Sequence, residues 1–264
     1  MNIRMICRVL GLILLILAGL LLLPCFVGLL YGERVTHFFL TAALSALLGL
    51  LLGRVRPQNR SLYAREGFVI VGLGWILLSL IGALPFVLGG SIPSYIDALF
   101  ETASGLSTTG ASILRDVEAL PRADMFWRIF THWIGGMGVL VFLLAVLPMS
   151  GEHSMHIMRA EVPGPTVGKL VPRVRRTAMI LYLIYLAMTM IEAGLLACGG
   201  MSFYDALLHA FATAGTGGFS TRAASIAAYN SVYIEMVVSV FMLLFGVNFN
   251  VFYQIGRASC RERV

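Results

Sequence analysis

The segment Leu106-Ser-Thr-Thr-Gly-Ala-Ser112 is a short run of small and polar residues with long apolar runs on both sides. A related segment, Gly215-Thr-Gly-Gly-Phe-Ser220, follows at an offset of 108 positions without a gap. The same offset relates Asp97 to Asp205 and extends to other neighbours. An internal repeat of this kind predicts two structural units of the same design, with the polar segment at an equivalent point in each.

The composition places most of the chain in a lipid bilayer. Of its 264 residues, 59% are hydrophobic and 12% are charged, whereas soluble domains average about 25% charged residues. The net charge of +6 is therefore interpreted as membrane topology and not as a nucleic-acid-binding surface. The four cysteines share no spacing and predict neither a disulfide framework nor a zinc site; they are Cys7, Cys25, Cys198 and Cys260.

Six segments are apolar and long enough to predict membrane-spanning helices, which need about 20 residues each. They are 8–30, 35–53, 67–90, 126–148, 177–199 and 231–253. Two shorter segments, 94–105 and 202–213, each precede one of the polar segments. They predict re-entrant half-helices, which a membrane accepts only where protein or water covers the loop ends. The first span is long for a cleaved signal peptide, so we interpret it as a retained signal-anchor.

These segments predict an all-α integral membrane protein with five regions. We expect a two-helix transmembrane hairpin at 1–60, a first helix–loop–helix unit at 67–150, a cytoplasmic linker at 151–176, a second unit at 177–254, and a polar tail at 255–264. The linker contains Pro163-Gly-Pro165, which breaks a helix. The tail is abruptly polar and is interpreted as a truncation or fusion scar, the alternative being a natural basic C-terminus.

The basic residues favour a cytoplasmic N-terminus. With that orientation the inner segments hold eleven arginines and lysines before the tail, and the outer segments hold five. Both polar segments then face the outside of the cell. The outer loops also carry acidic residues such as Asp116 and Glu118. These could concentrate cations at a pore mouth or simply be solvated, and the sequence leaves both interpretations open.

Both short helices have a recognisable beginning. Ser94 with Asp97, and Ser202 with Asp205, fit the S-x-x-[DE] pattern of a capped helix start. The serine oxygen accepts a backbone N–H, and the aspartate stabilises the positive end of the helix dipole. We expect these four residues to be caps and not ion ligands. Capping at the outer surface directs the partly negative C-terminal end of each half-helix into the membrane.

The loop chemistry is that of a cation filter. Backbone carbonyls can replace the water around a cation without binding it too tightly, and glycine reaches backbone angles that other residues avoid. The predicted ion-binding residues are Thr108, Thr109, Gly110, Thr216, Gly217 and Gly218. The residues predicted to flank them are Ser107, Ala111, Ser112, Gly215, Phe219 and Ser220. From this chemistry alone the ion is only a small cation.

An enzyme is the weaker interpretation. A membrane-embedded enzyme would need a nucleophile, a metal triad or paired acids within the spans, and none occurs at a useful spacing. His132 and Glu192 are the nearest candidates, but they fall on different predicted helices. Glu192 is the one acid well inside a predicted span. It is interpreted either as a functional charge or as a group that pairs with a neighbour.

Several motifs resemble the superfamily of potassium transporters that includes bacterial Trk and Ktr proteins and plant HKT proteins, and most closely its TrkH/TrkG branch. The motifs are Ser107-Thr-Thr-Gly-Ala-Ser112, His132-Trp-Ile-Gly-Gly-Met-Gly-Val-Leu-Val-Phe142, Leu147-Pro-Met149, Arg159-Ala-Glu-Val-Pro-Gly-Pro165 and Gly217-Gly-Phe-Ser-Thr221. The resemblance covers about residues 1–254. It implies two N-terminal helices followed by helix–pore-loop–helix repeats like those of potassium channels.

The resemblance also implies a function and partners. It implies potassium uptake across the bacterial inner membrane, passive or as symport with H⁺ or Na⁺, with K⁺ bound at the filter residues and no organic cofactor. The filter glycines of the family map to Gly110 and Gly218. A homodimer in the lipid bilayer and a cytosolic nucleotide-binding regulatory subunit similar to TrkA are expected. No nucleic-acid partner is expected.

This chain departs from the family pattern in having two repeats where the family has four. The element that gates the family's pore belongs to the third repeat, so no gating residue can be assigned. Two repeats supply half of a filter. A non-conducting fragment or scaffold subunit is therefore the main alternative function, and transport of sodium or another monovalent cation is a further one.

Overall fold

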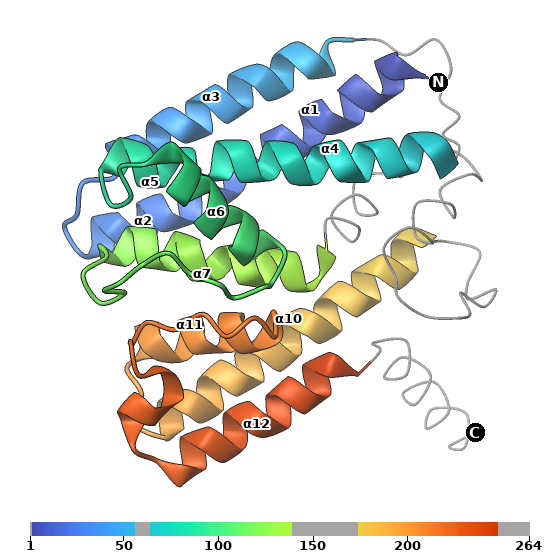
Figure 1. Cartoon of the computed structure of the whole chain (residues 1–264). Coiled ribbons are helices and arrows are strands. Elements are labelled where there is room, and N and C mark those ends of the chain that lie inside the picture. The colour runs from blue at the N-terminus through green and yellow to red at the C-terminus, as the bar shows by residue number, and fades with distance from the viewer. Residues whose placement is uncertain (1, 56–63, 139–173, 248–264) are drawn as a thin grey trace, which may run out of the picture.

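The computed structural model describes residues 2–55, 64–138 and 174–247, and within these ranges every regular element is a helix (Figure 1). The predicted tail at 255–264 and nearly all of the predicted linker lie outside the described residues. The helices are α1 (Ile3–Leu20), α2 (Leu22–Leu30), α3 (Thr36–Gly53), α4 (Ala64–Gly82), α5 (Leu84–Gly89), α6 (Tyr95–Leu106), α7 (Arg122–Gly136), α10 (Val174–Cys198), α11 (Phe203–Ala214), the 3-10 helix η2 (Ser225–Tyr229) and α12 (Val232–Gly246).

Four helical stretches of the described chain are long and apolar enough to cross a membrane. They are Ile3–Leu30, Thr36–Gly53, Arg65–Gly89 and Met179–Cys198. The helices at the other two predicted spans, α7 and α12, have 15 residues each, and residues 139–148 and 248–253 of these spans lie outside the described ranges. The first span begins earlier than predicted, because the helix continues through Arg4 and Arg8 to a cap at Asn2.

The N-terminal hairpin is held together by a close crossing of α1 and α3. A Cβ atom added to Gly11 would lie 2.7 Å from the carbonyl oxygen of Gly49, and one added to Gly49 would lie 2.8 Å from the carbonyl oxygen of Gly11. Ser45 donates a hydrogen bond of 2.7 Å to the Leu14 carbonyl at the same crossing. Small residues allow helix backbones to approach in this way where the hydrophobic effect is weak.

Helix α7 of the first unit packs against both half-helices. It contacts α6 of its own unit and α11 of the other. Phe130 and Trp133 of α7 each lie with their ring centroids 5.5 Å from that of Phe211 on α11. Trp127 is buried, and its indole N–H donates to the Gly82 carbonyl at the end of α4. These aromatic contacts fix the relative position of the two half-helices and of the loops that follow them.

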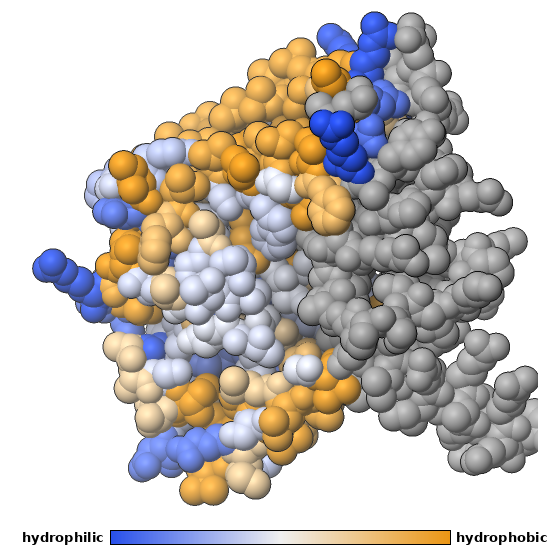
Figure 2. All heavy atoms as spheres, turned by 45° about the vertical axis from the view of Figure 1, so that its right-hand side comes forward, coloured by the Kyte–Doolittle hydropathy of each residue, from blue (hydrophilic) through white to orange (hydrophobic). Residues whose placement is uncertain are grey.

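The outer surface of several helices is apolar. Leu40, Leu47 and Leu50 of α3 and Leu243 of α12 are all more than half exposed. The face shown in Figure 2 carries extensive hydrophobic areas on both sides of a paler region of intermediate hydropathy. A soluble monomer rarely exposes so much contiguous apolar surface. The pattern is that of helices that face lipid, and with the long apolar helices it identifies a multi-pass membrane protein.

Candidate functional site

The first half-helix ends in a Schellman motif at the start of the predicted filter. Helix α6 has Ser107 as its C-cap. The N–H of Thr108 donates to the Gly105 carbonyl at 3.0 Å, and the N–H of Thr109 donates to the Ser104 carbonyl at 2.9 Å. This pair of bonds closes a helix when the residue after the cap is left-handed, a position that glycine usually occupies. Here threonine occupies it.

The second half-helix ends in the same way. Helix α11 has Gly215 as its C-cap. The N–H of Thr216 donates to the Thr213 carbonyl at 2.8 Å, and the N–H of Gly217 donates to the Ala212 carbonyl at 3.4 Å. The two predicted filters thus begin with the same backbone conformation, and the internal sequence repeat is matched by equivalent hydrogen bonds in the two units.

Both loops contain two left-handed residues separated by one residue that is not. The φ angles are 54° at Thr108 and 77° at Gly110, and 52° at Thr216 and 87° at Gly218. A threonine with positive φ is uncommon, because its branched Cβ crowds the backbone. Such strain persists only where the surrounding structure fixes the chain, and it is concentrated at functional sites.

We expect Thr108→Gly to raise the free energy of unfolding by about 1 kcal/mol, because glycine removes the left-handed strain. Thr109→Gly is the matched control. Thr109 is not among the residues with positive φ, so glycine there is expected to cost roughly 0.5–1 kcal/mol. Chemical unfolding in detergent micelles measures both variants. Equal destabilisation of the two would contradict the assignment of strain to Thr108.

The two loops touch each other. A Cβ atom on Gly110 would lie 1.8 Å from the carbonyl oxygen of Gly217 and 2.9 Å from its carbonyl carbon. Only a glycine fits at this point, both because of its φ angle and because of this neighbour. The structure therefore brings two predicted ion-binding residues, one from each unit, into direct backbone contact.

His132 of α7 lies directly behind the second loop. Its side chain is fully buried and stacks on the Phe219 ring, with 3.9 Å between the ring centroids. A Cβ atom on Gly215 would lie 2.6 Å from the His132 carbonyl oxygen, and one on Gly217 would lie 2.4 Å from the imidazole ring. Within the described residues, neither ring nitrogen of His132 has a hydrogen-bond partner. His132 thus supports the second loop by packing.

Ser112 and Ser220, the serines predicted to flank the filter, are held by the half-helices at equivalent positions. Ser112 donates to a carboxylate oxygen of Glu101 on α6, with an O–O distance of 2.9 Å. In the second unit the Ser220 hydroxyl lies 3.0 Å from Nε2 of His209 on α11. Glu101 and His209 are related by the same offset of 108 positions as the serines. Each unit thus has a contact between the half-helix and the serine after the loop, made by a carboxylate in the first unit and by an imidazole in the second.

The predicted caps lie at the starts of both half-helices. The Ser94 hydroxyl accepts from the Asp97 N–H at 3.4 Å, and the Ser202 hydroxyl accepts from the Asp205 N–H at 3.1 Å. Asp97 is exposed, whereas Asp205 is half-buried and its carboxylate also accepts from the Thr221 hydroxyl at 2.9 Å. Asp205 therefore holds the segment after the second loop in addition to the helix start.

Sequence reasoning missed four side chains at this site. Glu101, His209 and Arg128, which donates to the Ser220 carbonyl, support the loops, and His132 packs behind the second loop. The shared offset of Glu101 and His209 was the one available signal. Glu192, which the sequence singled out, is buried on α10. Within the described residues its carboxylate has no hydrogen-bond partner.

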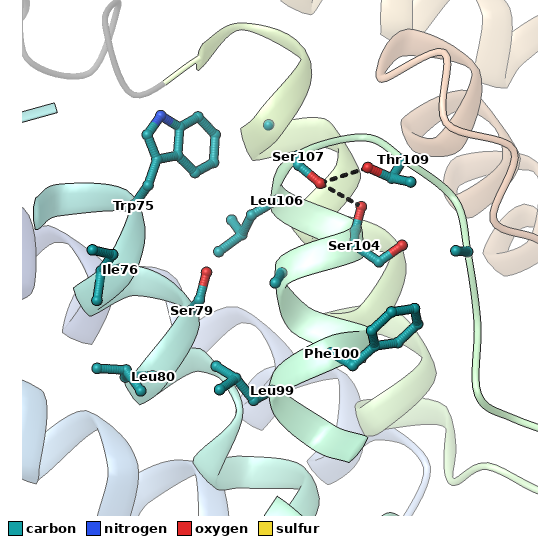
Figure 3. A pocket seen from close by; sticks show the side chains of 13 residues that line it. Trp75, Ile76, Ser79, Leu80, Leu99, Phe100, Ser104, Leu106, Ser107 and Thr109 are labelled. Carbon is teal, nitrogen blue, oxygen red and sulfur yellow. Dashed lines mark hydrogen bonds between the residues drawn. The ribbon is translucent and has the colours of Figure 1, made fainter. Parts of the chain in front are cut away.

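A groove of about 750 Å³ opens beside the first loop, between α4 and α6 (Figure 3). Trp75 and Ser79 of α4 line it together with Leu99 and Phe100 of α6. Four of the residues that line this groove have counterparts in the second unit, 108 positions later, that pack against α7. The corresponding pairs are Ala103 and Phe211, Ser107 and Gly215, Thr109 and Gly217, and Ala111 and Phe219. The first unit has no such helix at this face among the described residues.

Comparison with known proteins agrees with this arrangement. Residues 33–258 match the family model TrkH, described as a cation transport protein. The chain is 40% identical over 261 residues to the Trk system potassium uptake protein TrkH of Escherichia coli (strain K12), and 34% identical over 262 residues to TrkG of the same organism. These alignments cover 97% and 96% of this chain but 54% and 53% of the two proteins.

The fold also matches a solved structure. The crystal structure of the potassium transporter TrkH from Vibrio parahaemolyticus aligns with a TM-score of 0.82 and 35% sequence identity, covering 96% of this chain and 52% of that one. The chain thus spans about half the length of these relatives. The predicted all-helical membrane fold and the family resemblance are confirmed, and the family is one of transporters and not of enzymes. By its family match over 33–258, this chain belongs to the TrkH family of cation transport proteins.

Proposed function

We propose that this chain supplies two pore-loop units of a protein that takes up potassium across the bacterial inner membrane. The observation that carries the proposal is the pair of loops with matching left-handed residues, each at the C-terminal end of a capped half-helix and in contact through Gly110 and Gly217. The names of the matched relatives, which are potassium uptake proteins, favour K⁺ as the ion.

The proposed ion-binding groups are backbone and hydroxyl oxygens of Thr108, Thr109 and Gly110, with those of Thr216, Gly217 and Gly218 on the other loop. Within the described ranges no cluster of three or more His, Cys, Asp or Glu side chains could hold a metal ion. Oxygen dipoles without net charge let a monovalent cation enter and leave. The partly negative C-terminal ends of α6 and α11 would stabilise it on the way.

The groove beside the first loop supports the view that further units complete the pore. On the second unit, the equivalent face is covered by α7 of the first. We propose that a helix equivalent to α7, from another unit, fills the groove in the complete transporter. A non-conducting scaffold is the alternative for the 264-residue chain by itself, because its two loops enclose only part of a filter.

The orientation and partners follow from the sequence and the family. We propose that the N-terminus is cytoplasmic, so that both loops open to the outside, as the distribution of basic residues indicates. We also propose assembly as a homodimer and regulation by a cytosolic nucleotide-binding subunit similar to TrkA.

The test is potassium uptake in a bacterium that lacks its own potassium transporters. We expect a reading frame extended to the full length of the relatives to restore growth at low potassium, and the 264-residue chain alone to fail, because half of a filter does not enclose an ion. Rescue by the short chain would require two copies to complete the ring. Failure of the extended protein, when it is present in the membrane, would contradict potassium uptake.

A further inference from the structure

A buried ion pair lies between the two loops. Nε of Arg128 on α7 lies 2.6 Å from Oε1 of Glu101 on α6, and the two side chains are 3% and 0% exposed. Taking two charges out of water is costly, and the cost is recovered only when the remaining polar atoms also have partners. The other hydrogen-bond partners of Glu101 and Arg128 therefore indicate which parts of the structure this pair holds in place.

The Glu101 carboxylate binds the first loop just beyond its filter. Oε1 accepts from the Ser112 hydroxyl at 2.9 Å as well as from Arg128, and Oε2 accepts from the backbone N–H of Ile113 at 3.0 Å. Both oxygens are thus satisfied. Ser112 follows the filter glycine Gly110 by two positions, so that the carboxylate fixes the outer end of the first filter.

The Arg128 guanidinium binds the second loop at the equivalent point. Nη1 donates to the Ser220 carbonyl at 3.3 Å, and Cζ lies over the Phe219 ring, 3.6 Å from its centroid. Ser220 follows the filter glycine Gly218 by two positions, as Ser112 follows Gly110. A planar guanidinium can donate and stack at the same time, which an ammonium group cannot do.

We propose that the Glu101–Arg128 pair sets the spacing between the two filters and is thereby a positioning element for cation selection. The role in cation selection rests on the proposed function. The coupling between the loops, meaning that the ion pair holds both loops in position, does not. The pair joins Ser112 of the first loop to Ser220 of the second, which are equivalent positions in the two repeats. The second unit has no equivalent ion pair of its own among the described residues. The counterparts of Glu101 and Arg128 in the second unit are His209 and Met236, and Met236 is 61% exposed.

A second ion pair in the same loops provides a matched control. Glu118 and Arg222 are 3.1 Å apart and also join the two units, but their side chains are 45% and 47% exposed. Exposed pairs contribute little because water and salt screen them. Glu118→Gln removes this charge pair without touching the buried one, and is expected to change neither readout below by more than about twofold.

The first readout is amide hydrogen exchange of the 264-residue chain in lipid nanodiscs, which requires no transport. Exchange reports local opening of the backbone. Glu101→Gln is expected to raise exchange about tenfold both in 107–114, which Glu101 contacts, and in 215–222, which of the two partners Arg128 contacts and Glu101 does not. A rise confined to the first loop, or no rise, would overturn the coupling.

The second readout is the ratio of K⁺ to Na⁺ uptake by the extended protein. Glu101→Gln and Arg128→Met are each expected to lower it about tenfold, and the double variant by less than the product of the two, since neighbouring residues act together. An unchanged ratio in variants present at wild-type amounts would overturn the selectivity role. If the unaltered extended protein takes up no potassium, the proposed function fails, while the exchange experiment still tests the coupling.

Arg128→Lys covers the case in which loss of charge prevents folding. Lysine keeps the positive charge beside Glu101 but lacks the planar group that stacks on Phe219 and reaches Ser220. We expect wild-type amounts of this variant in the membrane, with exchange still raised in 215–222. Wild-type exchange in that segment would show that the charge alone suffices, and would overturn the proposed link through the guanidinium.

Discussion

Gly110→Ala is expected to lower potassium uptake by the extended protein about 100-fold. The added Cβ would overlap the Gly217 carbonyl of the other loop, and the residue has a φ of 77°. A left-handed alanine costs about 1–2 kcal/mol, and overpacking of fixed groups costs about 1–3 kcal/mol. A sum near 3 kcal/mol corresponds to roughly 100-fold fewer correctly formed filters. Uptake of potassium at matched protein amounts measures the loss.

Two other glycines separate strain from overlap. Gly90 has the same φ of 77°, and Gly218 has a φ of 87°, but a Cβ atom would meet nothing within 4 Å at either position. Gly90→Ala lies at the end of α5, away from the filter, and is expected to cost only the strain and to leave uptake within about threefold. Gly218→Ala should fall between the two. Equal loss at Gly90 and Gly110 would show that backbone strain alone is responsible.

Gly135→Ala is expected to have the second largest effect, although Gly135 is not a filter residue. A Cβ atom there would lie 2.2 Å from the Leu106 carbonyl oxygen and 3.0 Å from a methyl group of Thr108. Helix α7 would have to move away from the end of α6, where the first filter begins. We expect a loss of about 1–3 kcal/mol in the free energy of unfolding, measured in detergent, and about tenfold lower potassium uptake.

Gly194 on α10 is the control for Gly135. It is also a glycine within an apolar helix, but a Cβ atom there would meet nothing within 4 Å. Alanine favours the helix over glycine by about 1 kcal/mol, so Gly194→Ala should be neutral or stabilising. If both variants behaved alike, the loss at Gly135 could not be assigned to its contact with the filter.

The elements of this protein were predictable from the sequence because their signals are local. Long apolar runs predict spans at any position, and the serine and aspartate at 94 and 97 predict a capped helix that begins at Tyr95 in the structure. The offset of 108 positions depends only on residue identities. Ends of helices were less predictable: α1 begins at Ile3, ahead of the predicted span, and the Asn2 side chain caps it by accepting from the Met5 N–H.

The relation between the units was decided by tertiary structure. The sequence shows Glu101 and Arg128 only as two charges 27 positions apart, and their pairing depends on how α6 packs against α7. Gly110 meets Gly217, and His132 lies behind Gly215, because α7 sits against α11. Sequence alone determined that two loops of one design exist. Contacts between residues far apart in the chain, which no local propensity encodes, decided how those loops face and hold each other.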